Sequence, residues 1–298
     1  MILLTANTPE GPKLAAKTQQ GILVLAEASK LLGANGYGVP QTLREALSNP
    51  AVLKRLETVI SSVLSDDNAA KSLHRPEEEV RIAAPFTPRS IICVGLNYKD
   101  HAAEGGVKVP ERPVLFAKLP SSVIGPGEPI ILPPETNEVD YEAELAVVIG
   151  RRCKGVAADQ ALDYVAGYTC LNDVSARDFQ RGDGQWVRAK SQDTFCPFGP
   201  YLVTRDEICD PQRLAIRCLV NGRALQSSNT NKMIFSVAEI IAFTSRGITL
   251  EPGDIISTGT PHGVGFARKP PVFLRDGDEV VVEVEKVGRL ANPVKKIS

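Results

Sequence analysis

A pair of glutamates at the start of an apolar segment places the strongest constraint on how this chain folds. Glu142 and Glu144 lead into the run 145–149, whose composition favours a buried strand. Side chains alternate between the two faces of a strand, so both carboxylates point to the same side. Two like charges on a buried surface are costly unless a positive charge lies between them. The pattern predicts a bound divalent cation. Oxygen ligands of this kind suit Mg²⁺ or Mn²⁺ better than zinc, and Ca²⁺ is a further candidate.

The third ligand of this cation is predicted to be Asp173, which ends the apolar stretch 168–173. An aspartate at the end of a strand could complete a site of three carboxylates and leave positions for water and substrate. An aspartate in this place also commonly caps the helix that follows it. Because the glutamate pair occurs in the same chain, we favour the ligand over the cap.

A histidine and a glutamate three residues apart form a second candidate constellation. His101 and Glu104 would be neighbours on one face of a helix. A carboxylate beside an imidazole orients the ring and raises its basicity, which suits a general base near neutral pH. Taken alone, such a pair is more often a surface ion pair. Gly105 and Gly106 follow directly, so this short helix could belong to a mobile lid.

Two lysines and two further polar residues are candidates for substrate contacts. Lys118 and Lys190 each stand beside apolar residues, where a lysine can anchor a carboxylate or polarise a carbonyl. The more common role of such a lysine is at the surface, with its stem covering apolar neighbours. Arg177 and Gln180 lie four and seven residues after Asp173, a helical spacing that would let both face the cation.

The glycine- and threonine-rich loop 257–265 contains Thr260 and offers hydroxyl and backbone N–H groups to an oxyanion. It lacks the GxxxxGK[ST] pattern of nucleotide-binding loops. The chain also has no GxSxG nucleophile elbow, which argues against a serine hydrolase, and no GxGxxG.

Composition excludes several classes of protein. The 298 residues include 34 lysines and arginines and 35 aspartates and glutamates, so no basic surface for nucleic acid is expected. Six cysteines occur without a C-x-x-C pair, which favours reduced core thiols. There is no signal-peptide pattern, and no apolar run approaches the ~18 residues of a membrane span. We expect a soluble, cytoplasmic protein that binds neither nucleic acid nor membranes.

Residues 1–75 are predicted to form a small α+β domain. Strand-like segments occur at 12–17 and 21–26. Thr42 and Glu45 have the spacing of a capping box, and apolar residues then recur at helical spacing over 52–63.

Residues 76–298 are predicted to form a larger domain that is mainly β, a sandwich or roll with some helix, after a polar linker at 65–80. Asn221 and Gly222 read as a hairpin turn, and 235–243 has helical periodicity. The expected strands are the short apolar runs at 80–84, 91–94, 114–117, 130–132, 144–149, 214–220 and 280–284.

Taken together, these motifs resemble the fumarylacetoacetate hydrolase family, and six of them occur in the family's order from about residue 89 onward. The matching segments are 95–98 with His101 and Glu104, 116–118, 140–145, 172–178 with Gln180, 189–191, and 258–261 with 263–265. The resemblance implies a mixed β-roll, with the N-terminal region as a small extra domain, and a homodimer.

The resemblance also assigns roles to residues. It implies that Mg²⁺ or Mn²⁺ is held by Glu142, Glu144 and Asp173. In that family the histidine–glutamate pair, here His101 and Glu104, activates a water on a lid that closes over the substrate. Further roles are a catalytic one for Lys190 and contacts to the oxo-acid substrate for Lys118, Arg177, Gln180 and Thr260.

The leading functional prediction is a divalent-metal-dependent enzyme for 2,4-dioxo acids (acylpyruvates) or oxaloacetate. It would cleave a C–C bond through a metal-bound enolate. Because the same site could instead move a proton, the alternative is an oxaloacetate keto–enol tautomerase or a 2-hydroxyhepta-2,4-diene-1,7-dioate isomerase. A second alternative is a non-catalytic, metal-binding relic of the fold, against which the intact pair of His101 and Glu104 argues.

Overall fold

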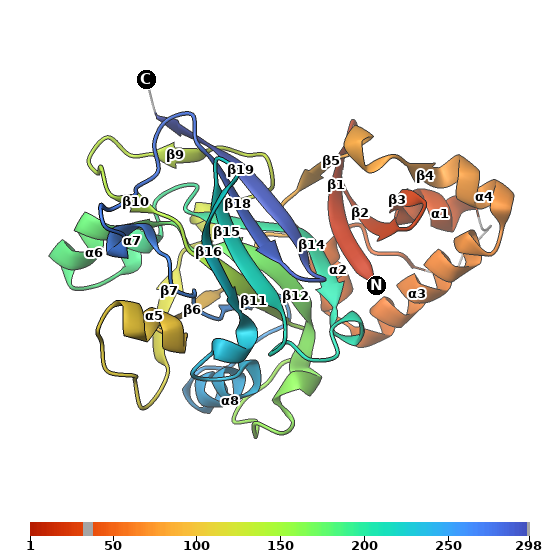
Figure 1. Cartoon of the computed structure of the whole chain (residues 1–298). Helices are drawn as coiled ribbons and strands as arrows, with labels where there is room; N and C mark the ends of the chain where they lie inside the picture. Colours follow the sequence, from red (N-terminus) through yellow and green to blue (C-terminus); the bar gives the residue numbers. More distant parts are fainter. Residues whose placement is uncertain (32–37, 297–298) are drawn as a thin grey trace.

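The computed structural model describes residues 1–31 and 38–296, and two packed β-sheets form its centre (Figure 1). The strands are β1 (Ile2–Thr8), β2 (Gly11–Thr18), β3 (Gly21–Val24), β4 (His74–Arg75), β5 (Arg81–Ala83), β6 (Ile91–Gly95), β7 (Val114–Lys118), β8 (Val123–Ile124), β9 (Ile130–Leu132), β10 (Val139–Asp140), β11 (Ala143–Ile149), β12 (Val165–Asn172), β13 (Ser175–Ala176), β14 (Cys196–Thr204), β15 (Ala215–Val220), β16 (Arg223–Asn229), β17 (Ile255–Ser257), β18 (Glu279–Val284) and β19 (Gly288–Lys296).

The helices are shorter and lie around the sheets. They are α1 (Leu25–Leu31), α2 (Leu43–Leu47), α3 (Pro50–Leu64), α4 (Asp67–Leu73), α5 (Lys99–Glu104), α6 (Arg177–Asp183), α7 (Val187–Lys190) and α8 (Val237–Gly247). Single 3₁₀ turns are η1 (Glu77–Glu79), η2 (Pro120–Ser122), η3 (Ala161–Tyr164), η4 (Arg205–Glu207), η5 (Thr230–Lys232) and η6 (Gly265–Ala267). None of these described helices has the length and apolar character needed to cross a membrane.

The larger sheet has the strand order β4-β3-β2-β1-β14-β12-β11-β17-β6-β7, with β5 on β1 and β8 on β14. The smaller sheet has the order β16-β15-β18-β19-β9, and β10 pairs with β13. The mainly β architecture predicted for the chain is confirmed. Strands β1 and β14 are hydrogen-bonded neighbours, so the larger sheet extends without a break into the N-terminal region (Figure 1).

The central strand β11 is buried on both faces, which explains its continuous apolar sequence. Leu145 and Val147 belong to the core between the two sheets. Ala146 and Val148 belong to a second core on the opposite face, which also contains Leu56 of α3. Glu142 and Glu144 share the face of Ala146 and Val148, as the alternation of the strand requires. The larger sheet therefore carries both glutamates into a buried region.

The segment 65–80 was expected to be a linker, but it contains α4, β4 and η1. Asp66 caps α4 by accepting hydrogen bonds from the N–H groups of Asn68 and Ala69. Strand β4 then pairs with β3. A second difference is at 25–26, predicted as strand, where α1 begins. Both helices have seven residues, so neither presents the repeated apolar spacing that a longer helix shows.

The predicted hairpin at Asn221 and Gly222 is confirmed and joins β15 to β16. The φ angles of these residues are 51° and 76°, as a type I′ turn requires at both central positions. The hairpin places β16 at the edge of the smaller sheet. Near the end of β16, Ser228 contacts Asp100 of α5, the helix that carries His101.

Candidate active site

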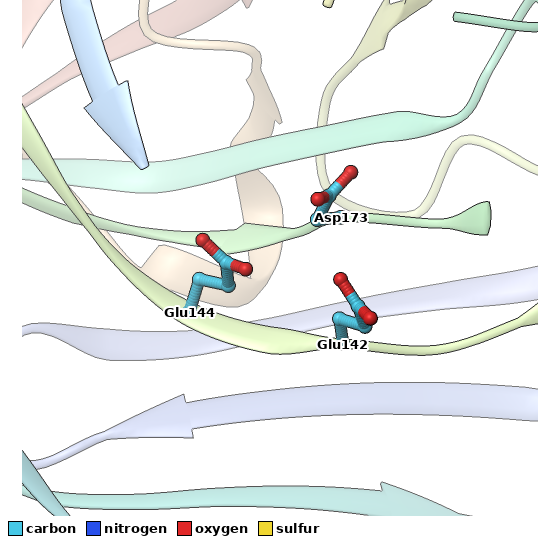
Figure 2. A group of neighbouring side chains, drawn as sticks. All are labelled: Glu142, Glu144 and Asp173. Atoms are coloured by element: carbon cyan, nitrogen blue, oxygen red, sulfur yellow. The ribbon is translucent and has the colours of Figure 1, made fainter. Parts of the chain in front are cut away.

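Three carboxylates meet at the ends of β11 and β12, as the sequence predicts. One oxygen from each of Glu142, Glu144 and Asp173 lies within 4.8 Å of the others, and all three residues are buried (Figure 2). Asp173 continues the β11–β12 ladder, because its N–H donates to the carbonyl of Glu142 at 2.9 Å. It does not cap the next helix, since the N-cap of α6 is Ala176. The sheet register thus brings the three side chains together.

Within this carboxylate triad, Glu142 has two cationic partners. Arg177 Nη2 donates to Glu142 Oε1 at 2.5 Å, and Lys190 Nζ donates to Oε2 at 2.7 Å. Burial alone would raise the pKa of Glu142. The adjacent positive charges of Arg177 and Lys190 outweigh burial and lower that pKa well below its usual range. Glu142 is therefore ionised at neutral pH.

Glu144 has a different environment. It accepts hydrogen bonds from the Ser257 hydroxyl at 2.5 Å and the Gly259 N–H at 2.8 Å, and no described lysine or arginine pairs with it. Burial, together with the charges of Asp173 and Glu142, raises the pKa of Glu144 above its usual range. A divalent cation among the three carboxylates would remove this cost. The oxygen donor set and the uncompensated Glu144 therefore fit a hard cation such as Mg²⁺ or Mn²⁺.

Both candidate lysines are buried within the site and are not surface residues. Lys118 Nζ donates to Asp173 Oδ1 at 2.6 Å and to the carbonyl of Val174 at 3.2 Å. Lys190 Nζ bridges Asp173 Oδ2 and Glu142 Oε2, each at 2.7 Å. The lysines come from β7 and α7, which the fold places beside the triad. Their contacts to substrate and the catalytic role of Lys190 stay predictions.

Asp140 is not among the site residues predicted from sequence, but it holds the arginine of the site in place. Its fully buried carboxylate accepts from Arg177 Nε at 2.8 Å and from the N–H of Gly265 at 2.7 Å. Arg177 Nη1 donates to Gln180 Oε1 at 2.9 Å, so these two residues lie together as expected. Asp140 stands two residues before Glu142, and the strand alternation that paired the glutamates could have identified it.

Replacing Asp140 by Asn should destabilise the protein by about 1.5–3 kcal/mol, because a hydrogen bond between buried charged groups is weakened. Urea unfolding with a two-state fit measures this change. Asp163→Asn is a matched control, since Asp163 pairs with Arg205 at the surface, where such pairs contribute about 0–1 kcal/mol. Equal, small effects of the two substitutions would contradict the structural role of Asp140.

The loop after β17 reaches the triad through its backbone. Gly259 has φ +93°, and a Cβ there would lie 2.7 Å from Cβ of Asn97. Glycine at this position allows the close approach that directs its N–H to Glu144. Thr260 donates from Oγ1 to the carbonyl of Ala143 at 3.0 Å and accepts from Gln226 at 2.8 Å. Thr260 thus lies beside the strand that carries the glutamates.

The predicted histidine–glutamate pair forms on α5. His101 Nδ1 lies 3.3 Å from Glu104 Oε2, with the two side chains 12% and 21% exposed. Burial opposes the ionised form of Glu104, but hydrogen bonds from His101 and from the Gly263 N–H outweigh it and lower its pKa. The described residues include no hydrogen bond between this pair and the triad. The loop 257–263 joins them, because Gly259 contacts Glu144 and Gly263 contacts Glu104.

A mixed β-roll with a buried carboxylate triad, connected through one loop to a histidine–glutamate pair, is typical of an enzyme suited to a hard divalent cation. The comparison with known families agrees. Residues 90–295 match the family described as fumarylacetoacetate (FAA) hydrolase C-terminal, so the chain belongs to the fumarylacetoacetate hydrolase family.

Relatives in this family catalyse more than one reaction. The chain is 52% identical over 244 residues to the mitochondrial oxaloacetate tautomerase Fahd2a of Rattus norvegicus, covering 81% of this chain and 78% of that protein. The structure of 5-carboxymethyl-2-hydroxymuconate delta-isomerase from Mycobacterium smegmatis matches with 36% identity and a TM-score of 0.76, over 100% of both chains. A fumarylacetoacetate hydrolase from Exiguobacterium antarcticum matches with 35% identity and a TM-score of 0.80, also over 100% of both chains.

Proposed function

We propose that the protein is a divalent-metal-dependent oxaloacetate keto–enol tautomerase. The observation that carries this proposal is the buried triad of Glu142, Glu144 and Asp173, in which Glu144 has no cationic partner among the described side chains. The name of the rat relative, at 52% identity, favours this reaction over the C–C bond cleavage that led the predictions from sequence.

The residues of the site would have two roles, the stabilisation of negative charge and the transfer of a proton. A divalent cation held by Glu142, Glu144 and Asp173 would act as a Lewis acid toward the carboxylate and adjacent carbonyl of the oxo acid. Lys190 and Lys118 add positive charge at the same place, which favours binding of a dianionic substrate.

Tautomerisation moves one proton and breaks no C–C bond. In the keto-to-enol direction, a base removes a proton from C3, and the oxygen at C2 gains a proton. His101 is the candidate base, since Glu104 accepts from its Nδ1 side and leaves Nε2 free to take a proton. Returning that proton to oxygen leaves His101 and Glu104 unchanged after each turnover.

The test follows the ultraviolet absorbance of enol-oxaloacetate as it converts to the keto form. With Mg²⁺ or Mn²⁺, the protein should accelerate the loss of absorbance well above the uncatalysed rate. EDTA should abolish the acceleration, and an excess of the same metal should restore it. A rate equal to that of buffer with metal alone would reject the proposal.

Hydrolysis of an acylpyruvate is a second candidate, because the pair of His101 and Glu104 could activate a water molecule. The match to a fumarylacetoacetate hydrolase supports this reading. Pyruvate release from acetylpyruvate and from oxaloacetate distinguishes the two candidates. Metal-dependent release above background would assign C–C cleavage, whereas conversion of the enol without pyruvate would assign tautomerisation. Membership in a family of enzymes leaves the non-catalytic alternative without support.

A further inference from the structure

A second acidic residue of α5 makes contacts that the proposed chemistry does not use. Asp100 stands directly before His101 in the chain. Its Oδ2 accepts a hydrogen bond from the Ser228 hydroxyl at 2.6 Å and lies 3.1 Å from Nδ1 of His262, an ion-pair distance without the angles of a hydrogen bond. Burial raises the pKa of Asp100, but the contacts from Ser228 and His262 outweigh burial and lower it. Asp100 is thus an ionised carboxylate held from two sides.

These contacts join α5 to two separate parts of the fold. Ser228 lies on β16, in the smaller sheet, and His262 lies in the loop that follows β17, in the larger sheet. The same loop holds the far end of α5, because the Gly263 N–H donates to Glu104. Two adjacent loop residues, His262 and Gly263, therefore contact acidic residues near the two ends of α5.

The helix needs such contacts. It has six residues, fewer than the ~12–15 that an isolated helix requires to be marginally stable in water. Its N-cap, Tyr98, provides no side-chain hydrogen bond, and two glycines follow its end. The position of His101 therefore depends on tertiary contacts. Asn97 and Tyr98 anchor the chain just before α5, Asp100 adds side-chain contacts at the first turn, and Glu104 adds them at the last.

We propose that Asp100, Ser228 and His262 form a clasp that fixes α5 and makes Asp100 a positioning residue for His101. The inference rests on the proposed function for the role of His101 in catalysis, whereas the clasp itself is a claim about the order of α5. Asp100 acts through the helix and has no part in binding the cation, since it pairs with none of the three ligands.

The test combines amide hydrogen exchange with steady-state kinetics on the full chain. Asp100→Asn should speed exchange in the peptide covering α5 by about tenfold to a hundredfold, the factor expected when a hydrogen bond to a charged group is lost. The kcat should fall about tenfold while KM changes less than about twofold, because the groups that bind substrate are untouched. His262→Ala, at a half-exposed position, should likewise speed exchange in the α5 peptide and lower kcat.

Asp163→Asn is the control, since it neutralises a surface aspartate that pairs with Arg205. A double substitution of Asp100 and His262 should have less than the summed effect on exchange, because both residues belong to one clasp. Unchanged exchange in Asp100→Asn would overturn the proposal, and lost kcat with unchanged exchange would instead make Asp100 a participant in the chemistry. If the wild-type protein has no activity on oxo acids, the proposed function fails, and the exchange data still decide the clasp.

Discussion

Glu144→Gln is expected to remove Mn²⁺ binding and turnover together while making the metal-free protein more stable. The substitution keeps the shape of the side chain and replaces a buried carboxyl group, which is costly to ionise because it has no cationic partner among the described residues, by a neutral amide. We expect a loss of turnover of about a thousandfold or more, since the cation supplies several kcal/mol of charge stabilisation. Thermal unfolding with and without Mn²⁺ measures both effects: the metal-free variant melts above the metal-free wild type, and added metal raises the Tm of the wild type alone.

The pH dependence of stability tests independently whether the buried Glu144 carboxyl destabilises the metal-free protein. The raised pKa means that folded Glu144 keeps its proton at pH values where the unfolded chain, with a glutamate pKa near ~4.3, has lost it. The metal-free wild type should therefore lose stability as the pH rises from ~4.3 to about 8, the pKa of folded Glu144, and the variant should lose less over the same range. Glu279→Gln, at an exposed position on β18, is the control. A metal-free variant that is less stable than the wild type at pH 7 would contradict this account of Glu144.

His101→Ala is expected to lower kcat by about a hundredfold to ten-thousandfold, the contribution of a positioned general base. Mn²⁺ affinity should stay within about twofold of the wild-type value, because His101 contacts Glu104 and none of the three carboxylates of the triad. Enol-oxaloacetate conversion and a metal titration on the same preparation measure the two quantities.

His74→Ala is the matched control for this substitution. His74 contacts the carbonyl of Ala70 in the N-terminal region, so its loss should leave both quantities near those of the wild type. Turnover that survives in His101→Ala would show that another group serves as the base. A parallel loss of metal affinity would show that the histidine supports the cation site.

Local patterns in the sequence were sufficient to predict the core of the site. Strand alternation places Glu142 and Glu144 on one face whatever the fold, and the buried cores on either side of β11 follow the same rule. Asp173 was ambiguous between a ligand and a helix cap, because both roles use an aspartate at the end of a strand. The register of β12 on β11 places Asp173 beside the two glutamates and away from the start of α6, and register depends on the whole sheet.

Residues whose partners are far away in sequence could not be placed in this way. A buried lysine and a surface lysine look alike in sequence, and Lys118 contacts Asp173 across 55 positions. The contact between Asp100 and Ser228 spans 128 positions and joins α5 to the smaller sheet. Helix α4 was missed for another reason, since a polar helix of seven residues shows no repeated apolar spacing. Long-range packing sets the positions of Lys118 and Asp100, and residue pattern alone does not encode it.

The most direct test of the central claim is an anomalous difference map from crystals grown with Mn²⁺. We expect a single strong peak among the carboxylates of Glu142, Glu144 and Asp173, with oxygen ligands from all three. The same map from Glu144→Gln crystals should show no peak at this position. A manganese peak at another place in the wild-type protein would contradict the account. So would a map without a peak in which Lys118, Lys190 and Arg177 still hold Asp173 and Glu142.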